Sequence, residues 1–273
     1  MMVYVKIKEG VSVMSMFKRM LANVGIGAAR VDLMLREPTV TAGDTITGVV
    51  RIQGGRVDQQ VEDVYAYVKT RYLKDVNHNQ MYVDATIAAI LLAGKFTVEA
   101  EREYEFPVAF RLPPYTPATM GGTQVWIRTG MEINEAIDPK DEDYLQVTPH
   151  PYISVVLKAA ERVGFRLRDA SCVHAPYHGI ARGMPFVQEF EFRPSLERWS
   201  RLDELQIVCY PDDDGVGLLL QIDRQARGFA GLFAEVADTD EERYARLRFK
   251  REQLAAGPDI VAAWIEEKVR KYG

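Results

Sequence analysis

The sequence contains very little cysteine. Cys172 and Cys209 are the two cysteines among 273 residues. Two cysteines are too few for a disulfide framework, so reduced thiols, as in cytosolic proteins, are the simpler prediction. Both cysteines lie in segments that we assign to one domain, which leaves a bridge between them open as an alternative.

Long apolar runs and an excess of positive charge are also lacking. No run is long enough to span a bilayer. The N-terminus carries Lys6, Lys8 and Glu9 and has no small-residue cleavage site, so it does not resemble a signal peptide. The formal net charge of −5 favours solubility and argues against binding to nucleic acid. We therefore predict a cytoplasmic protein without a nucleic-acid partner.

The local motifs of the common enzyme classes are missing too. The sequence has no Gly-x-Ser-x-Gly motif, no Walker-type loop and no dinucleotide fingerprint. Its four histidines fall in predicted loops or beside a predicted connector. We predict no enzymatic activity, no catalytic residue and no cofactor, while a site assembled from residues distant in the sequence stays open.

The first half of the chain alternates between apolar and polar residues. A hydrophobic content of 47% over 273 residues is enough for two domains with real cores. Four segments between Val31 and Val147 each predict a strand with one dry and one wet face, which is typical of two packed antiparallel sheets. Pro107 lies inside one of them and predicts an edge strand or a bulge, since proline cannot donate to the ladder. The segments are "TITGVVRIQ" (45–53), "VYAYVKTRY" (64–72), "EYEFPVAFRL" (103–112) and "QVWIRTGMEI" (124–133).

A connecting helix and a second β-rich block follow. Apolar residues at helical spacing between Pro151 and Gly164 predict the helix. Residues 186–192 alternate, and residues 203–223 predict a hairpin around "PDDDG" (211–215). "RYARLRFKRE" (243–252) reads as a strand, with a helix capped by Thr239 as the alternative. Residues 257–273 predict a terminal helix with the charges its dipole prefers.

Several segments together resemble a known family. "AGDTITGVVRIQGG" (42–55) followed by "QQVEDVYAYVKTRY" (59–72) resembles the first strands of an arrestin-like domain. The wider pattern is similar to the bacterial sporulation-control family called stage-zero M. It is carried by "MLANVGIGAARVD" (20–32), "GGTQVWIRTGMEINEAIDPKDEDYLQVTPHP" (121–151), "ERVGFRLRDA" (161–170), "GMPFVQEFEF" (183–192) and "LDELQIVCYPDDDGVGLLLQIDRQARGFAGLFAE" (202–235).

The resemblance implies an all-β fold of two tandem arrestin-like β-sandwich domains with a connecting helix and a C-terminal helix. We place the N-terminal domain at residues 14–148, the helix at 149–164 and the C-terminal domain at 165–273. It also implies a cytoplasmic regulatory role without catalysis. We therefore expect a scaffold or regulator that docks other proteins, through exposed strand edges such as that near Pro107 or through sandwich faces. Homo-oligomerisation by edge pairing is open on the same grounds.

One stretch of the second block favours a partner-binding surface. In "DRQARGFAGLF" (223–233), Arg224 and Arg227 flank an apolar run that contains Phe229. Arginine beside exposed apolar residues is typical of interfaces. The alternative is a loop that buries Phe229 and leaves the arginines solvated. We name Arg224, Arg227 and Phe229 as candidate partner-binding residues.

Two further clusters allow a metal ion but favour plainer interpretations. Cys172, His174 and His178 supply good zinc ligands, yet no fourth ligand is nearby. The three carboxylates of "PDDDG" (211–215) lack the spacing of a calcium loop and favour a solvated hairpin turn. We predict no metal site, and a metal-dependent enzyme that uses Cys172, His174 and His178 is the weakest alternative.

The N-terminal segment "MFKRMLANVG" (16–25) offers a competing function. Phe17, Met20, Leu21 and Val24 have helical spacing, with Lys18 and Arg19 on the opposite side. Such an amphipathic helix could contact an anionic membrane, although it more often closes the end of a sandwich. The alternative function is therefore a peripheral membrane adaptor.

Overall fold

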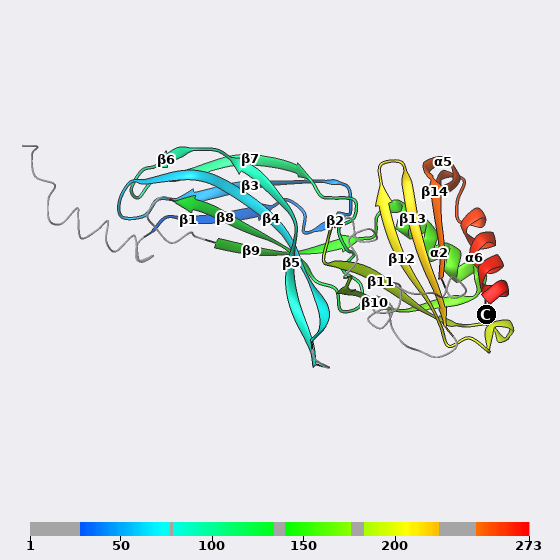
Figure 1. The fold of residues 1–273 in the computed structure, drawn as a ribbon. Helices are drawn as coiled ribbons and strands as arrows, with labels where there is room; N and C mark the ends of the chain where they lie inside the picture. The colour runs from blue at the N-terminus through cyan, green and yellow to red at the C-terminus, as the bar shows by residue number, and fades with distance from the viewer. Residues whose placement is uncertain (1–27, 77–78, 134–139, 176–182, 224–243, 273) are drawn as a thin grey trace, which may run out of the picture.

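The computed structural model describes residues 28–76, 79–133, 140–175, 183–223 and 244–272. Figure 1 shows two parts that lie end to end. The first part contains β1 (Arg30–Leu35), β2 (Thr39–Thr41), β3 (Thr45–Gln53), β4 (Gln59–Val76), β5 (Asn79–Ala93), β6 (Phe96–Val98), β7 (Glu103–Arg111), β8 (Val125–Ile133) and β9 (Lys140–Thr148). The second part contains α2 (Pro151–Val163), β10 (Phe165–His174), β11 (Phe186–Pro194), the 3₁₀ turn η1 (Glu197–Trp199), β12 (Glu204–Asp212), β13 (Gly215–Asp223), β14 (Tyr244–Lys250), α5 (Arg251–Ala255) and α6 (Asp259–Tyr272).

The first part is a β-sandwich. One layer has the strand order β1-β3-β7, and the other contains β4, β8, β9 and β2, with β5 and β6 paired to β4. The predicted dry faces point into one core, because Ile46 and Ile52 of β3 and Val64 and Val68 of β4 are almost fully buried. β7 ends its layer, which confirms the edge strand predicted from Pro107.

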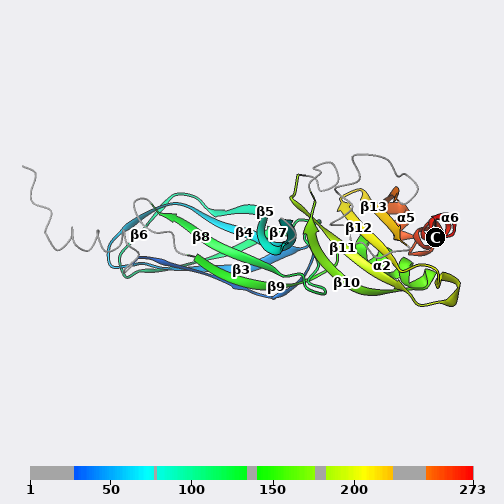
Figure 2. The same cartoon turned by 60° about the horizontal axis from the view of Figure 1, so that its bottom comes forward.

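The second part places helices against a sheet. Its described strands form an antiparallel sheet in the order β10-β11-β12-β13-β14, and α2 and α6 pack against one face around Phe190 and Phe192 (Figure 2). The hairpin forms as predicted, since Asp212 lies opposite Gly215. The all-β, arrestin-like class is confirmed, with a connecting and a terminal helix.

Local chemistry sets the ends of the connecting helix α2. The ring of His150 accepts a hydrogen bond from the N–H of Tyr152 at 3.3 Å. Gly164 has φ 102° and donates back to the last turn, a conformation that glycine adopts without strain. His150 therefore has a structural role, and burial lowers its pKa.

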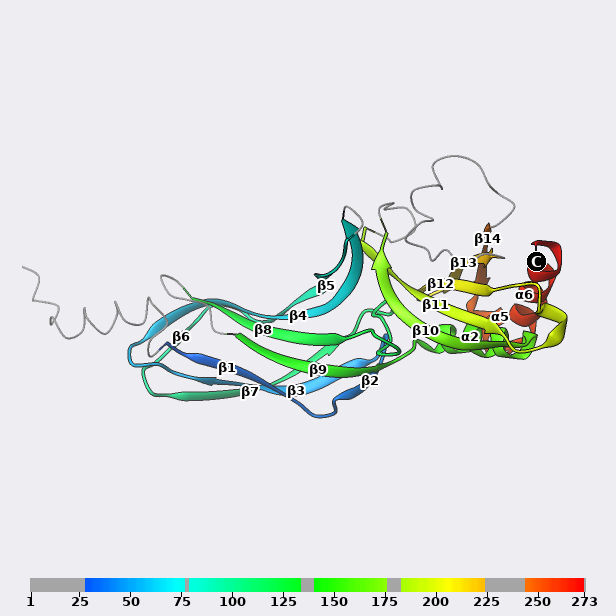
Figure 3. The same ribbon diagram turned by 90° about the horizontal axis from the view of Figure 1, so that it is seen from below.

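The two parts meet beside the projecting β4–β5 hairpin (Figure 3). Val173 of β10 pairs in parallel with Leu73 of β4. The ring of Tyr72 lies 5.7 Å from that of Phe186, and both belong to the core of the first sandwich together with Cys172. The boundaries of the two domains, 14–148 and 165–273, stay a prediction, but the core of the first sandwich includes Cys172 and Phe186 from the second part.

A glutamine side chain joins the two parts. The Gln188 amide donates to the carbonyl of Ala118 at 2.7 Å and accepts from the N–H of Ala118 at 2.8 Å. It also donates to Thr123 Oγ1 at 3.2 Å. The side-chain amide of Gln188 therefore satisfies both the N–H and the C=O of Ala118, as a neighbouring β-strand would.

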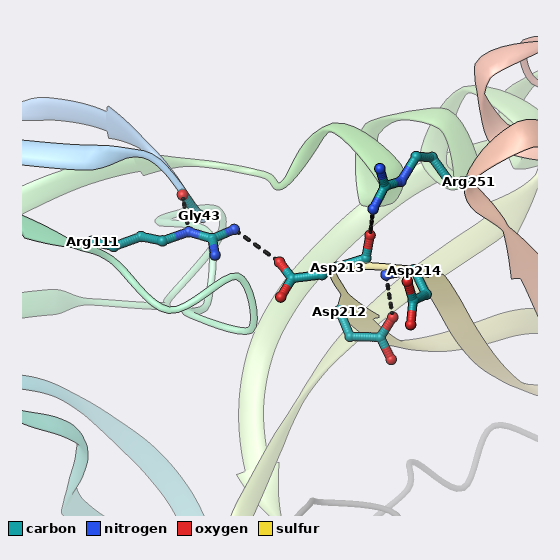
Figure 4. A network of polar contacts seen from close by, with 6 residues as sticks. All are labelled: Gly43, Arg111, Asp212, Asp213, Asp214 and Arg251. Carbon is teal, nitrogen blue, oxygen red and sulfur yellow. Dashed lines mark hydrogen bonds and ion pairs between the residues drawn. The ribbon is translucent and has the colours of Figure 1, made fainter.

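The predicted hairpin turn contributes an ion pair across the junction (Figure 4). Arg111 of β7 donates to the Asp213 carboxylate at 3.0 Å and to the carbonyl of Gly43 at 2.9 Å. The carboxylate of Asp212 accepts from Arg248 at 2.7 Å, and Arg251 donates to the carbonyl of Asp213. These contacts give the carboxylates of Asp212 and Asp213 arginine partners within the described residues.

We predict that Gln188 stabilises the junction more than Arg111 does. Gln188→Ala should lower the free energy of unfolding by about 1–3 kcal/mol, because it leaves two part-buried backbone groups of Ala118 unpaired. Arg111→Ala should cost less than about 1 kcal/mol, since its ion pair with Asp213 is exposed. Urea unfolding measures both. Gln60→Ala is the matched control, because its amide bonds to Thr97 at the surface; a larger effect of Arg111→Ala would contradict the prediction.

A carboxylate bonds to the backbone between the two layers of the sandwich. The N–H of Leu33 in β1 donates to the carboxylate of Asp141 in β9 at 3.1 Å. Asp143 lies two residues further on. Burial, and then the charges of Asp141 and Asp32, raise the pKa of Asp143 to about 7. The folded protein therefore favours a proton on Asp143.

This raised pKa predicts a pH dependence. Asp143 binds its proton more tightly when folded than at its ordinary value of 3.8, so its contribution to stability is full below about pH 4 and is lost as the pH rises through about 7. Asp143→Asn should remove this loss. Thermal unfolding of wild type and variant at several pH values between about 5 and 8 checks it. Parallel pH profiles for the two proteins would overturn the assignment.

Candidate functional site

Several residues singled out in the sequence lie outside the described residues. These are the candidate partner-binding residues Arg224, Arg227 and Phe229, the histidine His178, and the amphipathic segment 16–25. Their roles stay predictions. Within the residues that the structure describes, no helix is long and apolar enough to cross a membrane.

The other members of the proposed metal cluster have different surroundings. The Cys172 thiol is buried within 4.0 Å of the Thr70 hydroxyl and 3.9 Å of the Thr123 hydroxyl. Burial raises its pKa to about 12, which opposes the thiolate that a metal requires. The ring of His174 stacks on Tyr72. Over the described parts of the chain, no group of three or more ligating side chains could hold a metal.

Both cysteines are free thiols, as the simpler prediction held. Cys172 packs in the core of the first sandwich, whereas Cys209 packs against the core of the second part. Burial raises the pKa of the Cys209 thiol as well. Both side chains serve packing rather than reactivity.

A better candidate is the outer face of the first sandwich. Residues of β4, β8 and β9 that alternate with the core residues project from it, and the strand register sets Tyr67 beside Arg128 and Lys69 beside Trp126. Figure 3 shows the strands β9, β8, β4 and β5 that carry this surface. We define the outer face by Tyr65, Tyr67, Lys69, Arg71, Trp126, Arg128, Gly130 and Tyr144.

An aromatic and cationic stack lies at one end of the outer face. The Arg71 guanidinium lies 5.4 Å from the centre of the Trp126 ring, and the Tyr144 ring lies 6.0 Å from Trp126. Trp126 has the predicted outward orientation, yet it is only 2% exposed because these neighbours cover it. Tyr144 is 59% exposed. Tyrosine, tryptophan and arginine are the side chains that interfaces favour.

A hollow with two unpaired cations lies next to this stack. Its volume is about 360 Å³. Lys69 and Arg128 line it, half-buried, and neither has a carboxylate within ion-pair distance among the described residues. We call this the cationic hollow. Its lining residues are Tyr67, Lys69, Thr86, Arg128, Gly130, Met131 and Glu132.

The outer face is bordered by the strand β5, which sequence reasoning missed. Among the described strands β5 pairs only with β4. Its segment 85–94, "ATIAAILLAG", has no charge and no proline, and Leu91 is 55% exposed. Natural edge strands usually carry charged residues or proline, which prevent pairing with another chain, and this segment has neither. The uncharged run was the signal that could have found it.

The edge near Pro107 is less suited to pairing than β5. Strand β7 carries charged side chains on its exposed side, and Arg51 of the adjacent strand binds Glu103 at 3.0 Å and Glu105 at 2.7 Å. Proline and charge both oppose the addition of another strand. The geometry therefore favours β5 over the edge that the sequence suggested.

Known proteins share this architecture. The family model described as SpoOM protein matches residues 17–226. The sporulation-control protein spo0M of Bacillus subtilis (strain 168) is 39% identical over 262 residues, which cover 95% of this chain and 99% of that protein. The crystal structure of Spo0M, sporulation control protein, from Bacillus subtilis matches with a TM-score of 0.82 at 35% identity and covers 91% of this chain and 100% of that one. The family resemblance read from the sequence is confirmed, and the chain belongs to the Spo0M family.

Proposed function

We propose that this chain is a non-enzymatic regulatory protein that acts in the cytoplasm by docking partner proteins. The printed name of its Bacillus subtilis relative describes control of sporulation rather than a reaction. The observation that carries the proposal is the outer face, where Tyr144 is exposed beside Trp126. Leu91 is exposed on the bordering strand β5, and the cationic hollow lies between them. Exposed aromatic and apolar side chains with arginine nearby favour a protein partner.

The rigid sandwich beneath the outer face supports this function. Val64, Val68 and Ile127 are fully buried directly behind it, so the outward side chains are held by strands that cannot shift without exposing the core. A preorganised surface loses little conformational entropy when a partner binds. The proposed mechanism is therefore non-covalent docking to a surface that is already formed.

We predict that negative charge introduced on the outer face and the adjacent strand β5 abolishes partner capture. A Leu91→Glu, Tyr144→Glu double variant places carboxylates at two exposed apolar positions and should lose the proteins that wild type retains from native lysate, identified by mass spectrometry. The matched control is Ile260→Glu, because Ile260 of α6 is exposed by 44% on the second part. It should capture the wild-type set. Identical captures by all three folded proteins would remove the outer face from the proposal.

The predicted surface of the second part can be tested in the same way. If Arg224, Arg227 and Phe229 contact a partner, an Arg224→Glu, Arg227→Glu variant should lose a subset of the captured proteins. Circular dichroism and thermal unfolding establish that the variant is folded. Unchanged capture would place docking on the first part alone.

A further inference from the structure

We propose that β5 and the cationic hollow form one site that binds an acidic, extended segment of a partner protein as an added strand. This inference rests on the proposed function and specifies the chemistry of the partner. It joins two observations. The uncharged segment of β5 pairs only with β4 among the described strands. Lys69 and Arg128 have no carboxylate of a described residue within ion-pair distance.

The backbone of β5 provides the pairing surface. A strand with neighbours on one side presents N–H and C=O groups on the other, and an extended segment satisfies them by lying about 4.8 Å away. The segment 85–94 has no charged side chain or proline to oppose this. Figure 3 shows β5 beside β4 at the border of the outer face.

Lys69 lies within reach of such a segment. Lys69 of β4 pairs in register with Thr86 of β5. Arg128 pairs with Tyr67 from β8, on the other side of β4, and adds attraction at longer range. Thr86 is short and exposed, so the Lys69 chain can extend over it toward the added strand. A glutamate side chain on the added strand could then form an ion pair with the Lys69 ammonium group. Carboxylates two residues apart would share this face, because side chains alternate along a strand.

The charge around the hollow favours an acidic occupant. Half-burial removes water from Lys69 and Arg128, which raises the gain from an opposite charge. Arg71 already has Asp84 at 3.7 Å. Among the residues that line the hollow, Glu132 adds one negative charge to the two cations, so the lining has a net charge of +1. Glu142 lies opposite Arg128 in the register of β8 and β9, which leaves Lys69 as the main partner for the ligand.

The same charges argue against a second copy of this chain. Pairing β5 with β5 would bring two uncharged segments 85–94 together and supply no carboxylate to Lys69 or Arg128 from either of them. The other side of the added strand would lie beside Ala85 and Ile87, which are buried on the core side. The occupant should therefore alternate acidic and apolar residues.

Fluorescence anisotropy with labelled peptides tests the site. The probes are a Val-Glu repeat and a Val-Lys repeat of about ten residues. Wild type should bind the Val-Glu peptide, more weakly as salt increases, and should not bind the Val-Lys peptide. A Lys69→Gln, Arg128→Gln double variant should weaken binding by about tenfold or more. The matched control is Lys74→Gln, on the same strand and opposite side, which should bind as wild type does.

Hydrogen exchange locates the bound peptide independently of affinity. The Val-Glu peptide should slow exchange of β5 amides between residues 85 and 93 in wild type and not in the folded double variant. Protection confined to other strands, equal affinity for both peptides, or an unchanged affinity of the double variant would overturn the inference. A wild-type dimer that Leu91→Glu dissociates and that excludes the peptide would overturn it too, because a second copy would then occupy the edge.

The two proposals fail separately. If partner proteins are captured through the outer face but the Val-Glu peptide does not bind, docking stands and the acidic strand is wrong. If the peptide binds β5 but no protein depends on the outer face for capture, the site stands and the proposed function is wrong.

Discussion

The hydrogen-bonding demand of β4 organises the whole molecule. Its 18 residues present backbone donors and acceptors on both sides, and nearly all of them must be paired when buried. β8 satisfies one side, and β5 and β6 satisfy the other. Near its end β4 passes the sandwich, and Leu73 meets Val173 of β10 there. One strand therefore fixes the first core, the projecting hairpin and the contact with the second part.

The same strand links the interior to the proposed docking surface. Val64, Ala66 and Val68 are buried on one side of β4, whereas Tyr67 and Lys69 project from the other. The alternation that builds the core thus also spaces the cations and aromatic rings of the outer face. The proposed docking surface needs no loop of special geometry, since the pleat of a well-packed sheet positions it.

The sequence predicted what is local. Alternation marked β3, β4, β7 and β8, Pro107 marked an edge, and the Asp-rich turn marked the β12–β13 hairpin. It missed β5, because that segment is apolar on both sides and its register against β4 shifts between Val68 and Lys69. It could not show that Arg71 covers Trp126 or that Gln188 pairs with Ala118, since these contacts join distant residues that carry no local pattern. The cationic hollow could not be predicted either, because its lining residues come from β4, β5 and β8.

The completion of the first core by residues of the second part has a consequence for synthesis of the chain on the ribosome. Tyr72 of the first sandwich packs on Phe186, and Cys172 belongs to the same core. The nascent chain must therefore extend more than a hundred residues beyond β4 before that end of the core can close. Until then β4 and β5 carry exposed apolar surface near the translating ribosome. The first sandwich is consequently completed only after the strands that carry Cys172 and Phe186 have left the ribosome.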